Sequence, residues 1–246
     1  MSSVGVTRVT TMRSSYLSWA AAVELFERRG LPRETYGNLY EEQYILHSGS
    51  ASITGELSLN EHENRSPWRY DTPEGATGYI VDGDLSVEGN IVNDDDGAAA
   101  LVVLGDLRAA NIILEGDAKL LVRGDVEVET FVGNWTDKLV MIHGDLRAAV
   151  TIFWNEFYPD LITGTLRGRA LAPRYLDFSG LDIGRLEDPA PSTPLADLLV
   201  PEVLTNGAPE PDDFTEIGVR AEPLRERLRG GLPLIRNGRT VPTLSP

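Results

Sequence analysis

Apolar and polar residues alternate in a pattern that recurs along the middle of the chain, between Tyr79 and Arg169. A phrase of the form aliphatic-x-Gly-polar-aliphatic occurs there five times, and its glycines are separated by 22, 19, 20 and 20 residues; they are Gly83, Gly105, Gly124, Gly144 and Gly164. Residues two before the glycine, and two, four and eight after it, are apolar or small, whereas the odd positions near it are mostly polar. Alternation with a period of two predicts strands with one buried face.

The residue eight positions after each glycine is one of the apolar positions in this alternation. It is predicted to face inward and contains Ile91, Ile113, Val132, Ile152 and Ala172. Leu104 and Ile112 break the alternation. Weaker copies of the phrase precede and follow the five at Ile53-Thr-Gly-Glu-Leu57 and Phe178-Ser-Gly-Leu181.

A repeat of this length narrows the choice of fold. A strand-helix-strand unit needs about 30 residues, leucine-rich repeats need a recurrent Asn that only Asn111 offers, and a meander of hairpins needs a second regular turn. Left-handed hexapeptide coils favour a strict period of six residues, whereas steps of 19 to 22 residues suit looser coils better. We therefore predict a mainly β protein: a parallel β-helix, taken as right-handed, with about six to seven coils that stack at the spacing of neighbouring strands.

These coils, without cysteines, resemble the bactofilin or polymer-forming cytoskeletal β-helix proteins over roughly Gly55 to Gly168. The resemblance rests on the aliphatic-x-Gly-polar-Leu phrase and implies end-to-end self-assembly; it carries over no catalytic residue. The chain departs from that family through substantial segments at both ends.

Both terminal segments are predicted to contain helices. Residues 13–29 have an apolar stripe at helical spacing, with Ser14 or Ser15 as the N-cap and Gly30 as the end. We expect residues 1–47 to form an N-terminal helical cap that ends in a strand at 44–46, and residues 48–188 to form the β-helix, with a polar loop between Asn60 and Gly78.

Residues 189–246 are expected to form a C-terminal linker and helical cap. Helical spacing runs from Leu195 to Leu204, where Pro201 interrupts it, and again from Glu222 to Arg229. The two caps would cover the open ends of the β-helix, which argues for a monomer or small oligomer rather than a filament.

Charge and composition restrict the partners. The chain has 22 basic and 38 acidic residues, for a net charge of −16, and contains no cysteine. Such an acidic chain would repel nucleic acid and anionic lipid but would attract a basic protein. No stretch reaches the ~18 apolar residues of a membrane span. The absence of cysteine fits a reducing compartment, so we expect a cytoplasmic protein.

Two sets of polar residues have candidate chemistry. The residues directly after the glycines include Asp84, Asp106, Asp125 and Asp145, which if stacked would attract a cation or accept backbone N–H groups at bends; we favour the second interpretation. His143 could serve as a general base, but the sequence gives it no Ser, Asp or Glu companion. We therefore predict neither metal nor cofactor, and no enzymatic activity.

The back halves of the coils give the candidate binding site. Because equivalent positions stack, acidic and aromatic residues there should gather along one edge: Asp94, Asp95, Asp96, Trp135, Asp137, Trp154, Glu156, Phe157, Tyr158 and Asp160. Aromatic anchors beside charges of one sign are typical of protein interfaces. The alternative is that Phe153 and Trp154 pack against the C-terminal segment.

The prediction is a non-enzymatic protein that binds a basic protein, such as an immunity or antitoxin-like inhibitor of a toxin. Two alternatives remain open: a self-assembling scaffold of the bactofilin type, and a β-helix acyltransferase or carbohydrate-acting enzyme.

Overall fold

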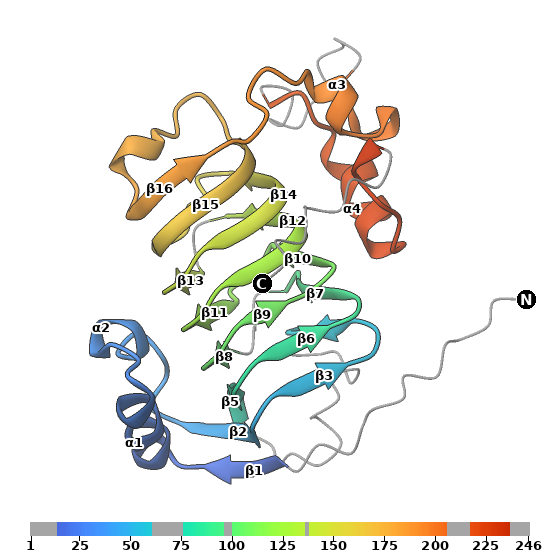
Figure 1. The fold of residues 1–246 in the computed structure, drawn as a ribbon. Helices are drawn as coiled ribbons and strands as arrows, with labels where there is room; N and C mark the ends of the chain where they lie inside the picture. Colours follow the sequence, from blue (N-terminus) through green and yellow to red (C-terminus); the bar gives the residue numbers. More distant parts are fainter. Residues whose placement is uncertain (1–13, 61–75, 96–99, 136–137, 206–216, 237–246) are drawn as a thin grey trace, which may run out of the picture.

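A computed structural model describes residues 14–60, 76–95, 100–135, 138–205 and 217–236. It shows a mainly β protein with 44% strand and 19% helix, in which parallel strands form a β-solenoid of about five turns (Figure 1). The predicted fold class is confirmed, with slightly fewer turns than expected. The polar loop predicted between Asn60 and Gly78 lies largely outside the described residues.

Three stacks of parallel strands make up the solenoid, and each coil adds one strand to each stack. The first stack contains β2 (Gln43–Ser48), β5 (Ala76–Asp82), β8 (Ala100–Val103), β11 (Lys119–Val122) and β13 (Leu139–Ile142). The second begins with β3 (Ala51–Ile53), β6 (Leu85–Val87) and β9 (Leu107–Arg108). The third begins with β4 (Leu57–Ser58), β7 (Asn90–Asn93) and β10 (Asn111–Leu114). In the later coils, longer strands bend from one stack into the next: β12 (Val126–Asn134), β14 (Leu146–Trp154) and β15 (Leu161–Leu171), followed by β16 (Ile183–Glu187).

The repeated Gly-Asp pair forms a corner between the first and second stacks. The Asp84 carboxylate accepts the backbone N–H of Asp106, and Asp106, Asp125 and Asp145 accept the next coil's N–H in the same way, at 2.8–2.9 Å. A Cβ at Gly124 would lie 2.2 Å from the Asp106 carboxylate, so the glycine leaves room for the aspartate of the preceding coil. The aspartates are therefore hydrogen-bond acceptors between coils.

Two outlying members of the glycine column differ from the prediction. Gly83 stacks on Gly49, not on Gly55, which instead lies beneath Gly89 at the next corner. At the other end, Gly184 in β16 stacks on Thr163 and Gly164, while Gly180 belongs to the short 3-10 helix η2 (Phe178–Gly180). The phrase around residue 49 lacks the aspartate, and so it does not stand out in the sequence.

The column eight residues after the glycine faces inward only in part: Ile91 and Ala172 belong to the interior cluster, whereas its three middle members face outward. Ile112 pairs with Ile91 and Phe131, and these three side chains fill the core of the solenoid. Ile113, Val132 and Ile152 point to the outer side of the third stack. The corner between the second and third stacks shifts the alternation by one residue, because a bend need not contain an even number of residues. This explains why Ile112 broke the predicted pattern.

The N-terminal segment covers the outer side of the first stack. It begins as strand β1 (Ser14–Leu17), which pairs antiparallel with β2, and continues in helices α1 (Trp19–Arg29) and α2 (Arg33–Tyr36). Helix α1 therefore starts after Ser18, whose hydroxyl accepts the N–H of Ala21, and not at residue 13. It ends as predicted at Gly30, which has φ of 71°.

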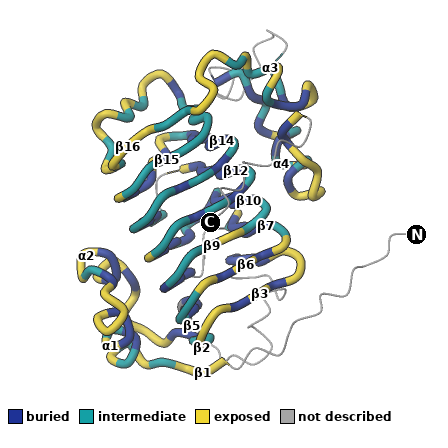
Figure 2. The backbone as a smooth tube through the Cα atoms, in the orientation of Figure 1, coloured by how far each residue is buried: buried dark blue, intermediate teal, exposed yellow. Residues whose placement is uncertain are grey.

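The face of α1 that packs differs slightly from the predicted stripe. Ala22, Leu25 and Phe26 are buried against Ile80, Val102 and Leu121 of the first stack. Tyr16 belongs to β1 and is exposed, as is Ala20. We define this N-terminal cover as residues 14–40. It lies beside the coils, and only β1 lies at an end of the sheet, against β2 (Figures 1 and 2).

The C-terminal segment covers the outer side of the third stack. It contains α3 (Leu195–Leu198), the 3-10 helix η3 (Pro201–Val203) and α4 (Ala221–Arg229). Leu199, Val203, Leu224 and Leu228 are fully buried there in a cluster with the outward side chains of the third stack. We define the C-terminal cover as residues 195–205 and 217–236. Among the described residues, both terminal segments thus flank the solenoid, since the apolar outer sides of two stacks need cover, and only β1 lies at an end of the sheet, where the caps were expected.

Candidate functional site

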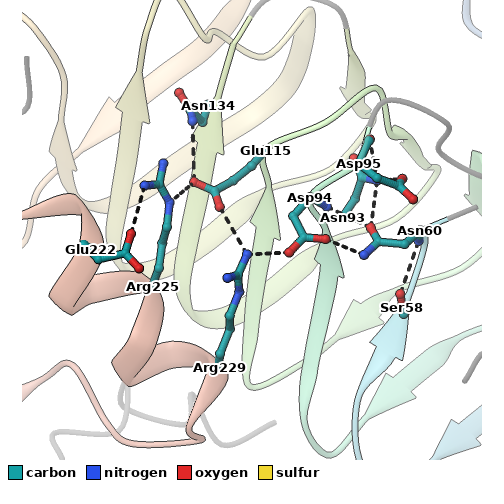
Figure 3. Close-up of polar contacts among 10 residues, drawn as sticks. All are labelled: Ser58, Asn60, Asn93, Asp94, Asp95, Glu115, Asn134, Glu222, Arg225 and Arg229. Atoms are coloured by element: carbon teal, nitrogen blue, oxygen red, sulfur yellow. Dashed lines mark hydrogen bonds and ion pairs between the residues drawn. The ribbon is translucent and has the colours of Figure 1, made fainter. Parts of the chain in front are cut away.

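A column of polar residues on the outer side of the third stack lies under α4. Strand pairing aligns Leu114 of β10 with Asn93 of β7 and with Gly133 of β12. The residues that follow these three, Asp94, Glu115 and Asn134, therefore occupy equivalent places in successive coils. We call these three residues the acidic edge. The Asn134 amide donates to Glu115 Oε1 at 3.5 Å, and the Asn60 amide donates to Asp94 (Figure 3).

Two arginines of α4 neutralise the acidic edge. Arg225 Nε lies 2.6 Å from Glu115 Oε1, and Arg229 Nη2 bonds to Asp94 and lies 3.8 Å from Glu115 Oε2. The Glu115 side chain is only 7% exposed. A carboxylate this deeply buried needs a charged partner, and its arginine comes from a segment 110 residues later in the chain (Figure 3).

Two predicted partner-binding aromatics are buried and cannot contact a partner. Trp154 is 1% exposed and packs in the cluster between the third stack and the C-terminal cover, as the alternative interpretation expected. Phe157 is fully buried: its ring stacks on Phe153 at 5.2 Å between centroids and fills the space above Gly133. Phe153 also belongs to the interior of the solenoid. Aromatic content alone could not separate these core residues from surface ones.

The exposed aromatic residues of the predicted edge lie at the turn after the third stack. Trp135 is 58% exposed and Tyr158 is 48% exposed, and Glu156 is exposed between them in sequence order. Strand pairing places Asn134 beside Trp154, so Trp135 neighbours the turn at Asn155 and Glu156. We call Trp135, Glu156 and Tyr158 the aromatic corner.

The remaining acidic residues of the prediction have different roles. Asp160 is structural, because its carboxylate accepts the N–H of Val140 at 2.7 Å; burial raises its pKa. Asp95 is half-buried and accepts from the Asn93 amide at 3.3 Å. Asp96 and Asp137 lie outside the described residues. Of the eight predicted residues that the structure describes, four are exposed: Asp94, which is paired with Arg229, and the three residues of the aromatic corner.

Neither of the other candidate sites has the geometry of a reaction centre. His143 Nε2 is 2.8 Å from Thr35 Oγ1, but Thr35 is fully buried, so the pair joins α2 to the solenoid. In the aspartate column, burial would raise the pKa of Asp125, but the N–H of Asp145 and the Arg147 guanidinium hold it below its ordinary value. Within the described ranges, no group of three or more His, Asp or Glu residues could hold a metal ion.

Three residues of this region were missed from the sequence: Glu115, Arg225 and Arg229. Glu115 was missed because counting from the glycine aligns Asp94 with Gly116, whereas strand pairing aligns it with Glu115. A signal for the arginines was present, since Leu224-Arg225 and Leu228-Arg229 are two identical pairs four residues apart in an acidic chain.

Comparison of the chain with protein-family models, curated proteins and solved structures finds no match. In the part of the chain that the structure describes, every helix is too short or too polar to cross a membrane.

Proposed function

We propose that this protein is a non-enzymatic binding protein that contacts a basic protein partner through the aromatic corner. The observation that carries the proposal is Trp135, which is 58% exposed and has φ of 68°. A bulky residue rarely adopts a positive φ, and strained residues of this kind concentrate at functional sites. Core packing does not require this tryptophan, since most of its surface is in solvent.

The neighbouring turn supports the same surface. Asn155 and Glu156 also have positive φ, of 42° and 63°, and with Trp135 they are the non-glycine residues of this type among the described residues. All three lie in adjacent coils at one turn. Exposed Trp and Tyr are the side chains most often found as anchors in protein interfaces.

Charge indicates the kind of partner. The net charge of −16 creates a field that would attract a basic protein and speed its encounter with the corner. Inhibition of a basic toxin, such as a nuclease, in a reducing cytoplasm is one role such a protein could serve. Within the described ranges, neither the His143–Thr35 pair nor the aspartate column offers a nucleophile or metal site to a substrate.

The test is a binding measurement with matched variants. Partners are captured on the full chain and on a Trp135→Asn, Tyr158→Ala variant; Asn is chosen because it tolerates a positive φ. The control is Tyr175→Ala, which removes a side chain that is 63% exposed elsewhere. We expect capture of a basic protein to fall about tenfold or more only in the corner variant, and equal capture by all three proteins would contradict the proposal.

A second candidate function is end-to-end assembly, which the bactofilin resemblance implies. The observation that favours it is β16, which among the described strands pairs only with β15 and leaves Leu186 46% exposed. Light scattering would test it: a single species with the mass of one chain would exclude assembly, whereas large particles that Leu186→Lys abolishes would support it.

A further inference from the structure

We propose that the acidic edge is a receptor for a basic amphipathic helix of the partner, and that α4 occupies this receptor in the free protein. The inference rests on the proposed function and specifies the partner: a helix with two Leu-Arg pairs one turn apart. The C-terminal cover would then act as a displaceable internal ligand.

Helix α4 contributes two equivalent pairs of contacts. Leu224 and Leu228 are fully buried against the third stack, and the arginine after each leucine reaches a carboxylate of the acidic edge. Residues four apart lie on one face of a helix, so both pairs engage at once. By contrast, Arg227 faces away and donates to the Pro233 carbonyl at 2.7 Å.

The solenoid supplies matching groups for the packed face and the C-terminal end of this helix. Val92, Ile113 and Val132 belong to the apolar cluster that holds the leucines. Glu115 and Asp94 receive the arginines, and the Asn90 amide donates to the Leu228 carbonyl at 2.8 Å. Carbonyls in the last turn of a helix lack partners within the helix, so Asn90 binds the helix end as well as its side.

Charge distinguishes this segment from the rest of the chain. Residues 217–236 contain five arginines and two glutamates, a net charge of +3, whereas the whole chain has −16. The outer contact is also accessible to solvent: the Arg229 side chain is 45% exposed and that of Asp94 is 31% exposed. An exposed ion pair is weak and is screened by salt, so a second basic helix could compete there first and displace α4 from the Asp94 end.

The test uses a labelled peptide with the sequence of residues 217–236 and measures its binding to the full-length protein at low salt. In wild type, the tethered α4 competes at a high effective concentration. In the Arg225→Ala, Arg229→Ala variant this competitor is weakened. We expect the variant to bind the peptide about tenfold more tightly than wild type does, and Arg227→Ala, the matched control, to behave as wild type.

The receptor is tested in the same background. Adding Asp94→Asn and Glu115→Gln to the double-arginine variant should abolish the gain in affinity. A peptide with glutamate at the positions of Arg225 and Arg229 should not bind. Equal affinity of the peptide for wild type and the double-arginine variant would overturn the proposal.

A measurement on wild type guards against variants that fail to fold. Excess peptide should increase amide hydrogen exchange in α4 and leave exchange in α1 unchanged, since α1 packs on the other flank. If peptide at millimolar concentration leaves α4 exchange unchanged, the internal-ligand proposal is overturned. Loss of partner capture in the Trp135 and Tyr158 variant would still support the proposed function, so the two failures are distinguishable.

Discussion

The two covers hold opposite flanks of the same solenoid by different means. In the N-terminal cover, Trp19, Phe26 and Tyr36 form an aromatic cluster with ring centroids 5.4–6.5 Å apart. The charge pair Arg29–Asp82 lies at the exposed rim, and a part-buried polar contact is the hydrogen bond between Thr35 and His143. In the C-terminal cover, a nearly buried carboxylate, Glu115, lies among the apolar contacts and is paired with Arg225.

Under the internal-ligand proposal, this difference distinguishes a permanently attached cover from one whose charge pairs a second helix could replace, although both covers also bury apolar side chains. Apolar packing depends little on ionic strength, whereas charge pairs with one exposed member weaken with salt. A cover that binds mainly by packing is an integral part of the fold. A cover that binds through guanidinium-carboxylate pairs follows a pattern that another basic helix can reproduce.

The largest expected effect comes from removing the centre of the aromatic cluster. Phe26→Ala should lower the free energy of unfolding by about 3–5 kcal/mol, because the side chain is fully buried and leaves a cavity. Urea denaturation measures the change. Tyr175→Ala, in contrast, should cost under about 0.5 kcal/mol, since that ring is 63% exposed. Equal losses in the two variants would show that the cluster does not hold the cover.

A smaller effect is expected from neutralising the carboxylate of the other cover. Glu115→Gln should cost about 1–3 kcal/mol, because it replaces a charge-assisted bond to Arg225 by a weaker one at a site that is 7% exposed. The loss should shrink slightly as salt is raised, because Glu115 also lies 3.8 Å from Arg229, whose side chain is 45% exposed, whereas the loss in Phe26→Ala should not change. Denaturation at two ionic strengths measures both losses. A loss in Glu115→Gln that does not change with salt would contradict the proposed difference between the two covers.

The N-terminal cover should also respond to pH through His143. Burial lowers the pKa of this histidine below its ordinary value of 6.5, with nearby Arg123 acting in the same direction and Glu34 opposing it. The unfolded chain therefore takes up the proton first, so stability is lost as pH falls below about 6.5. His143→Gln, which can still bond to Thr35, should lose less stability than wild type between pH 7 and 5.5 in thermal melts; equal losses would exclude this role.

The smallest effect is expected on the second stack, whose outer side carries neither cover. Arg108 and Glu127 form an ion pair of 3.2 Å there, with side chains 62% and 38% exposed. Arg108→Ala should change the free energy of unfolding by less than about 0.5 kcal/mol, because exposed pairs contribute little. If Arg108→Ala lost as much stability as Glu115→Gln, burial under a cover would not explain the larger contribution of the Glu115 pair.

Much of the fold was predictable because parallel stacking repeats the same local chemistry. Gly83 to Gly164 mark the same corner in successive coils, and Gly30 marks the end of α1. The side of each strand that faces inward was predictable only up to the next bend, as Ile112 and Ile113 show. A period of two carries no information across a corner.

The candidate site was less predictable, because burial depends on segments far away in the chain. Trp154 and Trp135 are both aromatic residues of the same coil region, but α4 covers the first and leaves the second exposed. Similarly, Asp94 and Glu115 gain their arginines from residues more than a hundred positions later. The spacing of residues within the repeat therefore cannot predict such distant partners.

The aspartate column has a consequence for the evolution of chains of this kind. Because each carboxylate accepts the backbone N–H of the next coil, removing residues 106–124 would join Gly105 to Asp125 and leave Asp84 facing the N–H of another aspartate. A deletion of half that length would turn polar side chains inward. Genetic insertions and deletions should therefore be tolerated in whole coils, so that the length of the scaffold varies in discrete steps.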